Sequence, residues 1–464
     1  MERSKYLMKN TALFALGNIG TKLISFFLVP LYTNALSTSE YGVVDLVMTI
    51  CMVLVPILTL NIGESIMRYS LDKDANYDKI MSVGYIIMFF SIVVGFFILP
   101  VSHFFTPIKE YGIHIYLYSI TFGISQIFIC NLRGREKLLQ YAICNIIHTL
   151  SIALLNIYFL LIVKQGIIGY FWAYIIANLI TTVYAVYASR TKFHFSLDGQ
   201  LMKSMIAFSI VLIPNSFMWW IMNSSDRIMV TAMVGEAANG IYAISYKVPT
   251  LVSTISVVFN QAWSYSAIKE NKSDDNETYC NIMYDKLTKM LILFTGGLMM
   301  IMKPFLSFYV EKSYYVAWRY TPYLLIGFLF MTLGSFLATS YTVHKDSKGF
   351  LISGMFGAVV NLILNALLIP YLGVAGAAVA TCISYFTVYV FRVWHTRKYL
   401  VIHVIQKEHL VGIFLLFILG GTMFVDNNVG QVILIAEYVL MLILFRKFIV
   451  DFFCMFTKLI RNKK

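Results

Sequence analysis

Two long apolar runs at the start of the chain restrict its fold more than any other feature of the sequence. The first, Asn10–Leu36, contains one charged residue, Lys22, and the second is Val43–Ile66. A short polar turn, residues 37–42, separates them. Because about 20 helical residues cross the roughly 30 Å hydrocarbon layer of a bilayer, each run is long enough to span it. The sequence therefore predicts a helical hairpin in a membrane.

The same pattern continues to the end of the chain. Hydrophobic residues make up 59% of the sequence and charged residues 13%, a composition typical of polytopic membrane proteins. We therefore expect an all-α polytopic membrane protein with about 14 transmembrane helices of roughly 20 residues. After the first hairpin the expected spans are residues 80–101, 113–132, 139–163, 169–189, 203–234, 240–263, 287–310, 320–343, 350–370, 375–393, 410–425 and 429–445.

The chain also contains an internal repeat. Leu160-Leu161-Ile162 with Gly166 and Gly169 recurs, at a constant offset, as Leu367-Leu368-Ile369 with Gly373 and Gly376. Six spans separate the equivalent helices, so the halves have the same orientation and should be related by rotation about the membrane normal. The predicted parts are an N-terminal six-helix bundle (1–189), a C-terminal six-helix bundle (203–393), two additional transmembrane helices (410–445) and a basic cytoplasmic tail (446–464).

The distribution of positive charge predicts the orientation of the chain. The net charge is +13, but Lys and Arg lie in short loops between spans, which argues against a nucleic-acid partner. With the N-terminus inside, the inner segments hold most of these charges, including residues 133–137, residues 392–398 and the C-terminal tail. The positive-inside rule therefore predicts a multi-pass protein of the cytoplasmic (inner) membrane with both termini in the cytoplasm.

Several short motifs point to a family. They are Lys9-Asn10, Phe26–Leu36 continuing into Ser39-Glu40-Tyr41-Gly42, Gly63 followed by Arg68-Tyr69, Asp226-Arg227, and Gly240-Ile241-Tyr242 with Lys247. In these residues the chain resembles the Wzx-type polysaccharide or oligosaccharide flippases of the multidrug/oligosaccharidyl-lipid/polysaccharide exporter superfamily. The likeness extends over about residues 5–400.

The resemblance implies two six-helix bundles around a central cavity, with alternating access for a lipid-linked oligosaccharide such as an O-antigen, capsule or exopolysaccharide unit. It implies a polyprenyl-pyrophosphate-linked oligosaccharide and the lipid bilayer as partners, together with polysaccharide polymerase and chain-length proteins, and no cofactor or metal. A multidrug or cation antiporter and a peptidoglycan-precursor flippase of the same superfamily are the alternatives. A membrane polymerase or glycosyltransferase is more remote, because the longest internal loop, residues 264–286, is short for a catalytic domain. We therefore expect a transporter and not an enzyme.

Ionisable residues within or beside the spans are the candidate site, because a charge in hydrocarbon is costly unless it faces a cavity or a partner. A pyrophosphate-linked substrate would need fixed cations along its path, and Arg and Lys both bind phosphate. The candidate substrate-binding residues are Lys22, Arg68, Arg227 and Lys247; Asp226 and Glu64 are candidates for ion coupling or ion pairing. Internal ion pairs or positions at the ends of spans are the structural alternatives.

Four prolines lie in the spans that open each half: Pro30, Pro56, Pro214 and Pro249. Proline lacks a backbone N–H and clashes with the preceding turn, so kinks are expected at these positions. Such kinks would suit gating.

Overall fold

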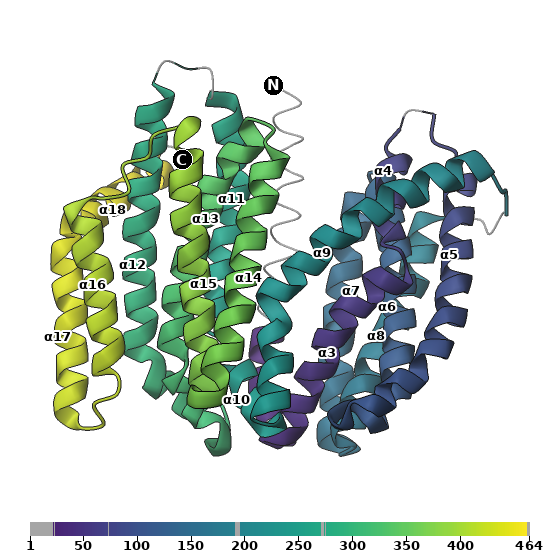
Figure 1. Cartoon of the computed structure of the whole chain (residues 1–464), viewed down its shortest axis with the longest axis horizontal. Coiled ribbons are helices and arrows are strands. Elements are labelled where there is room, and N and C mark those ends of the chain that lie inside the picture. Colours follow the sequence, from purple (N-terminus) through teal and green to yellow (C-terminus); the bar gives the residue numbers. More distant parts are fainter. Residues whose placement is uncertain are drawn as a thin grey trace. The chain divides into compact units, whose positions relative to one another are not determined.

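The computed structural model describes residue 22 and residues 24–72, 74–190, 195–270, 273 and 275–461. These residues form helices joined by short connections, with no strand among them (Figure 1). The first helices are α2 (Val29–Ala35), α3 (Thr38–Leu58), α4 (Ile62–Ser70), α5 (Tyr77–Ile98), α6 (Gly112–Gly134), α7 (Leu138–Asn156), α8 (Gly166–Ser189), α9 (Gly199–Met233) and α10 (Glu236–Ser245). The others are α11 (Pro249–Glu270), α12 (Asn276–Tyr309), α13 (Thr321–Val343), α14 (Ser347–Leu372), α15 (Val374–His395), α16 (Lys407–Thr422), α17 (Asn428–Leu444) and α18 (Arg446–Arg461). Shorter segments are η1 (Leu99–Phe104), η2 (Thr106–Tyr111), η3 (Ile157–Ile162), η4 (Lys312–Arg319) and η5 (Thr396–Lys398).

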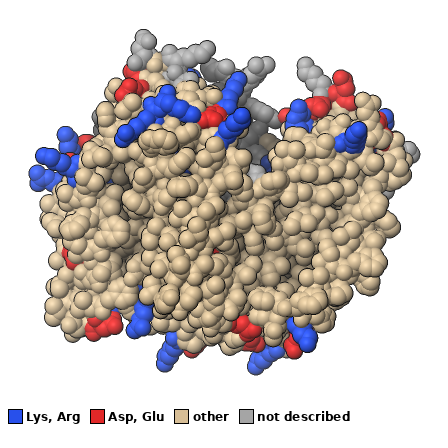
Figure 2. Space-filling model, viewed as in Figure 1, with Lys and Arg blue, Asp and Glu red and all other residues tan. Residues whose placement is uncertain are grey.

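The prediction of an all-α polytopic membrane protein is confirmed. Within the described residues, ten helices are long and apolar enough to cross a bilayer, and shorter apolar helices cover Ile24–Ala35 and Asn428–Leu444. The helices follow the order of the predicted spans. On the face in view in Figure 2, Lys, Arg, Asp and Glu gather at the helix ends and are sparse along the helix sides. This distribution matches the cost of placing charge in hydrocarbon.

Two of the predicted proline kinks are complete helix breaks. The second span ends as α3 two residues after Pro56, and the N–H of Asn61 donates to the carbonyl of Pro56 across a wide turn (2.9 Å). Leu60 and Asn61 have φ of +48° and +53°, which no helix can continue through. The eighth span divides between α10 and α11, which begins at Pro249. By contrast, Pro214 lies inside the continuous helix α9.

The chain divides into two compact units, Met1–Gly240 and Ile241–Lys464. In the first unit α6 is central and packs against α3, α4, α5, α7 and α8. Ile66 of α4, Met81 of α5, Ile127 of α6 and Met205 of α9 belong to its buried core. Because lipid tails are as apolar as these side chains, close packing between helices stabilises such a core more than transfer out of water does.

In the second unit α13 is the most enclosed helix and packs against α11, α12 and α15. Small residues allow the close approach of α13 and α15. A Cβ on Gly327 of α13 would lie 3.1 Å from the Cα of Cys382. Gly376, Ala377 and Ala380 of α15 are also buried. Small residues at helix contacts are typical of membrane bundles, where they let backbones meet.

The seventh predicted span, α9, packs against α3, α4 and α5. The hydroxyl of Ser65 donates to the carbonyl of Met205 (2.6 Å), which fastens α4 to α9. The sequence pattern predicts this span as part of the C-terminal bundle, whereas its contacts group it with the first unit. The bundle boundaries at 1–189 and 203–393, and the relation of the bundles by rotation, remain predictions.

The repeat is visible in local structure. In the connections α6–α7 and α13–α14, one residue adopts a left-handed conformation, Glu136 at φ +56° and Lys345 at φ +57°. The next residue, Lys137 or Asp346, then donates its N–H to a carbonyl five residues back. The two halves therefore share this connection in backbone geometry as well as in their place in the span order.

The additional helices predicted in 410–445 are α16 and α17, and both pack against α12. In the first half of α12, Lys289 pairs with Asp285 (3.0 Å) and Glu408 (2.7 Å). In its second half, Lys303 pairs with Asp426 (2.5 Å). Ion pairs in both halves of α12 thus join it to α16 and to the connection between α16 and α17. The described part of the basic tail is helix α18.

Candidate functional site

Lys22 and Lys247, two of the four predicted cationic substrate contacts, lie in different units. Lys22 is helical and its side chain is exposed. Lys247 lies in the break between α10 and α11 and is partly buried; its carbonyl accepts a hydrogen bond from the Thr250 hydroxyl (2.7 Å). Lys22 belongs to the first unit and Lys247 to the second. Their role as substrate contacts remains a proposal.

Glu64 and Arg68 lie one turn apart on α4. The guanidinium of Arg68 pairs with Asp72 (2.6 Å), and both side chains are more than half exposed. An exposed pair of this kind contributes little to stability and can exchange partners readily. Asp72 is therefore the competing anion that a substrate would meet at Arg68.

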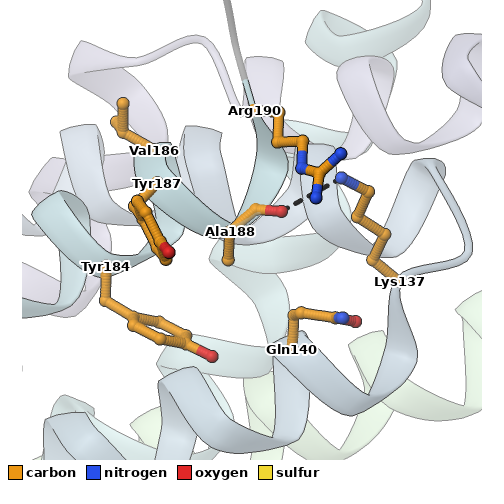
Figure 3. A pocket seen from close by; sticks show the side chains of 7 residues that line it. All are labelled: Lys137, Gln140, Tyr184, Val186, Tyr187, Ala188 and Arg190. Carbon is orange, nitrogen blue, oxygen red and sulfur yellow. Dashed lines mark hydrogen bonds between the residues drawn. The ribbon is translucent and has the colours of Figure 1, made fainter.

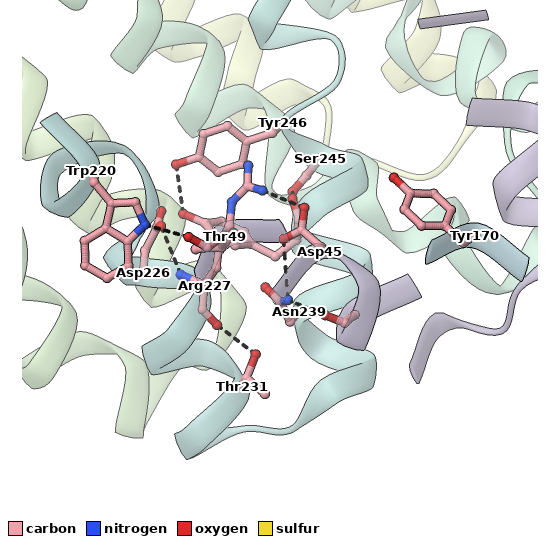
Figure 4. A network of polar contacts seen from close by, with 12 residues as sticks. Asp45, Thr49, Tyr170, Trp220, Asp226, Arg227, Thr231, Asn239, Ser245 and Tyr246 are labelled. Carbon is pink, nitrogen blue, oxygen red and sulfur yellow. Dashed lines mark hydrogen bonds and ion pairs between the residues drawn. The ribbon is translucent and has the colours of Figure 1, made fainter. Parts of the chain in front are cut away.

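Arg227 is in a different environment. Its Nη1 lies 2.5 Å from Oδ1 of Asp45, and this pair joins α9 to α3 within the first unit (Figure 4). The side chains are 21% and 10% exposed. Asp45 lies seven residues after the start of α3, and Arg227 six residues before the end of α9. At 1.5 Å per residue, both charges are about 10 Å from the helix ends.

One face of α3 supports this pair. Asn239 donates from Nδ2 to the carbonyl of Gly42 (2.8 Å) and lies 3.5 Å from Oδ2 of Asp45. Further along α3, the indole N–H of Trp220 donates to the carbonyl of Thr49 (2.7 Å). Positions 42, 45 and 49 lie on one side of a helix. The side chains contacted there come from α9 and α10, as Figure 4 shows.

The start of α10 lies unusually close to α3. A Cβ on Gly42 would come 1.8 Å from the carbonyl oxygen of Glu236, and a Cβ on Gly240 would come 2.0 Å from that of Thr38. The hydroxyl of Ser39 also donates to Glu236 (2.7 Å). Only glycine permits this approach, so Gly42 and Gly240 fix the spacing that brings Asn239 to Asp45.

Asp226 is adjacent to Arg227 in sequence but is more deeply buried. Its side chain is 2% exposed, and its Oδ1 accepts the backbone N–H of Arg227 (3.0 Å). Neighbouring residues on a helix point about 100° apart, so one can face α3 while the other faces elsewhere. Asp226 is thus a buried carboxyl group, and Asp45 is the acidic partner of Arg227.

The sequence pattern predicts Arg227 as a site residue but not Asp45 or Asn239. Asp45 lies near the beginning of the predicted span Val43–Ile66, where a carboxylate is easily taken as interfacial. The signal in the sequence is the capping box of Ser37 and Glu40, which marks the start of α3 at Thr38 and so places Asp45 two turns inside that helix. Asn239 carries no charge, so nothing in the pattern of charges could mark it.

The arrangement suits reversible binding of an anion. The guanidinium of Arg227 can form paired hydrogen bonds with phosphate or carboxylate oxygens, and Asp45 occupies it here. An incoming phosphate would replace one carboxylate with another anion, which avoids leaving the guanidinium unpaired in the membrane. Among the described residues, no group of three His, Cys, Asp or Glu side chains is placed to hold a metal ion.

Comparison with known proteins agrees with the fold and with the sequence motifs. A family model described as polysaccharide biosynthesis protein matches residues 7–272. Over 79 residues the chain is 38% identical to an uncharacterized membrane protein of Methanocaldococcus jannaschii; the match covers 17% of this chain and 16% of that relative.

Two transporter structures share the fold. One is a multidrug resistance MATE family transporter of the MOP superfamily in an inward-facing conformation, with a TM-score of 0.67 and 12% identity over 82% of this chain and 93% of that one. The other is the Lipid II flippase MurJ in an inward closed conformation, with a TM-score of 0.66 and 15% identity over 94% of this chain and all of that one. With this fold and a family match across more than half of its length, the chain belongs to the polysaccharide biosynthesis protein family.

Proposed function

We propose that the protein moves a lipid-linked oligosaccharide across the cytoplasmic membrane by alternating access, with Arg227 as a contact for the pyrophosphate. The family match supports a role in polysaccharide biosynthesis, and the fold is that of transporters. The observation that carries the proposal is a guanidinium about 10 Å from the end of α9, partly exposed and paired with Asp45 of the candidate membrane span Thr38–Leu58. Lys22, Arg68 and Lys247 are proposed as further contacts along the path.

A charged side chain that faces hydrocarbon destabilises the inserted protein. Even lenient insertion scales assign roughly 2.5–3.5 kcal/mol to an Arg or Lys at the centre of a span. Asp45 offsets this cost while no substrate is bound, and the pyrophosphate offsets it when substrate displaces Asp45. The cation thus keeps an anionic partner in both states, and the exchange gives the substrate access without exposing a charge to hydrocarbon.

The test is flipping of a fluorescent polyprenyl-pyrophosphate-linked oligosaccharide in proteoliposomes, measured by an impermeant quencher. Arg227→Gln should slow flipping about tenfold or more, because hydrogen bonds to charged groups contribute about 1.5–3 kcal/mol. Arg227→Lys should retain part of the rate. Asp45→Asn keeps the guanidinium and removes its competitor, so the apparent affinity for substrate should not fall. Lys348→Gln, at an exposed position in the first turn of α14, is the control for loss of one charge.

Equal losses in Arg227→Gln and Asp45→Asn, with normal protein levels, would show that the pair is structural. Lipid II in the same assay tests the peptidoglycan-precursor alternative, which shares the pyrophosphate. The multidrug or cation antiporter alternative is favoured by one observation, the buried carboxyl group of Asp226. Uptake of an organic cation that Asp226→Asn abolishes, without flipping of either glycolipid, would establish that alternative instead.

A further inference from the structure

A pocket of about 830 Å³ lies in the first unit, between the start of α7 and the end of α8. Its lining residues are Lys137, Gln140, Tyr184, Val186, Tyr187, Ala188 and Arg190, which we call the α7–α8 pocket. These lining residues include two cations and no carboxylate. Figure 3 shows the ammonium group of Lys137 and the guanidinium of Arg190 beside each other, with the rings of Tyr184 and Tyr187 across from them.

The positive charge here is concentrated. Lys137 donates from Nζ to the carbonyls of Ala188 and Ser189 (3.0 Å each), and Arg135 donates to the carbonyl of Ser189 (3.0 Å). Burial, and then the neighbouring charges of Arg135 and Arg190, lower the pKa of Lys137. Three cations thus lie within electrostatic reach of one another at the end of α8. An anion bound among them would relieve their mutual repulsion.

The equivalent place in the second unit holds an anion built into the chain. There the carboxylate of Asp346 caps α14, accepting from the N–H of Gly349 (2.9 Å), from Lys398 (3.1 Å) and from the hydroxyl of Tyr399 (2.7 Å). Lys137 occupies the corresponding position before α7 and caps it with no side-chain hydrogen bond. At this position the second unit therefore has a carboxylate, Asp346, whereas the first unit has a cation, Lys137, and a pocket.

Arg190 itself adopts a conformation that glycine would adopt more easily. It ends α8 with φ +52° and ψ +38°, the left-handed position at which helices commonly carry glycine. This backbone conformation is strained for a residue other than glycine. The charge and length of the Arg190 side chain are reasons for a residue other than glycine at this position.

The surroundings of the pocket indicate a lipid and not a soluble anion. Tyr187 is 80% exposed, and the same helical stripe continues along α8 through Val183 (71% exposed) and Ile180 (41% exposed). In a membrane-spanning helix such a stripe faces lipid tails, and tyrosine commonly lies at headgroup level. A phosphate in the pocket could therefore belong to a molecule whose acyl chains lie along Val183 and Ile180.

We propose that the α7–α8 pocket binds the phosphate headgroup of an anionic glycerophospholipid from the surrounding bilayer. Lys137 and Arg190 provide the charge, Gln140 and the tyrosine hydroxyls provide hydrogen bonds, and the exposed stripe of α8 receives an acyl chain. Basic pockets beside transmembrane helices are a known way of selecting anionic lipids. The site is separate from Arg227 and does not depend on the substrate proposed above.

The test is native mass spectrometry of the full-length protein, delipidated in detergent and titrated with phosphatidylglycerol or with phosphatidylcholine. We expect tighter binding of phosphatidylglycerol, and about fivefold weaker binding in Arg190→Gly, since one basic residue near an anionic lipid contributes about that much. Arg190→Gly should fold well because glycine suits the backbone conformation at this position. The matched control is Lys345→Gly, which removes one exposed cation from the same left-handed conformation outside the pocket.

Each other outcome overturns the proposal. Equal binding of the two lipids would show no headgroup selection, and equal losses in Arg190→Gly and Lys345→Gly would show a diffuse charge effect. Glycerol phosphate that competes as strongly as the intact lipid would identify a soluble-anion site. Stronger competition by polyprenyl phosphate than by phosphatidylglycerol would identify a site for the carrier lipid instead.

Discussion

At the scale of single residues, the pairing of Arg227 with Asp45 accounts for a cation that hydrocarbon would otherwise exclude. Removing one member of a buried pair generally costs about 3–5 kcal/mol, because the other member is left uncompensated. The sequence could predict Arg227, since an Arg within an apolar run stands out. It could not predict its partner, because Asp45 is 182 residues away along the chain and only the fold brings α3 beside α9.

Asp346 gives a prediction about acid stability. Hydrogen bonds from Gly349 N–H, Tyr399 and Lys398 hold the pKa of its carboxyl well below the usual value. A carboxyl with a lowered pKa in the folded state contributes stability above its unfolded value, about 3.9, and that contribution is lost as pH falls further. We therefore expect this contribution to the thermal stability of the wild-type protein to be lost as pH falls from about 4 to 2, and Asp346→Asn to show a flatter dependence on pH.

Thermal unfolding in detergent across this pH range measures the effect. Asp72→Asn is the comparison, because Asp72 is also a carboxylate in an ion pair beside the end of a helix, but an exposed one. It should leave the slope close to that of the wild type. If Asp346→Asn keeps the full acid-dependent loss, other carboxyl groups are responsible for it.

At the scale of helices, the approach of α10 to α3 depends on two glycines, Gly42 of α3 and Gly240 of α10. Gly42 and Gly240 each face a backbone carbonyl at a distance that no Cβ could share. Gly42→Ala should therefore destabilise the protein by at least about 1–3 kcal/mol, the usual cost of inserting atoms into a packed contact. It should also weaken the Asn239 contact to the Gly42 carbonyl.

The matched change is Gly354→Ala in α14, where a Cβ would meet nothing within 4 Å. Alanine is favoured over glycine inside a helix by roughly 0.5–1 kcal/mol, so this variant should be neutral or slightly more stable. The measurement is the thermal unfolding midpoint of Gly42→Ala and of Gly354→Ala in the same detergent. Equal midpoints would mean that α3 and α10 separate without cost.

The existence of the helices could be predicted from the sequence, but not all of their breaks or partners. Apolar length is enough to find the spans, and Pro56 and Pro249 correctly point to the two that are interrupted. The break after α3 also needs the left-handed conformation at Leu60 and Asn61. Asparagine often adopts this conformation, but a leucine side chain does not predict it. Similarly, the composition of α9 contains no information on which unit it packs against, because an apolar helix suits any apolar partner.

At the scale of the whole molecule, α16 and α17 are joined to α12 by the Lys289 and Lys303 ion pairs. Lys303 also lies 4.0 Å from the ring centre of Trp318. A chain ending before Lys407 would leave Lys303 without Asp426 while retaining its contact with Trp318. We expect that truncated protein to enter the membrane but to unfold at a lower temperature than the full-length protein, which fluorescence-detected size exclusion after heating would reveal. Lys303→Gln alone should reproduce part of the loss.

The predicted orientation of the chain can be tested at three exposed positions, Lys109, Arg397 and Asn428. Positive charge resists transfer across the membrane, so the loop with Arg397 should be cytoplasmic, whereas Lys109 and Asn428 should be outside. Single cysteines at these positions, in a chain whose native cysteines are replaced, should react with an impermeant maleimide in intact cells at Lys109→Cys and Asn428→Cys only. Arg397→Cys should react after permeabilisation.

If Asn428→Cys is protected together with Arg397→Cys, α16 and α17 do not cross the bilayer and the count of fourteen spans is wrong. If Arg397→Cys alone reacts in intact cells, the whole orientation is inverted.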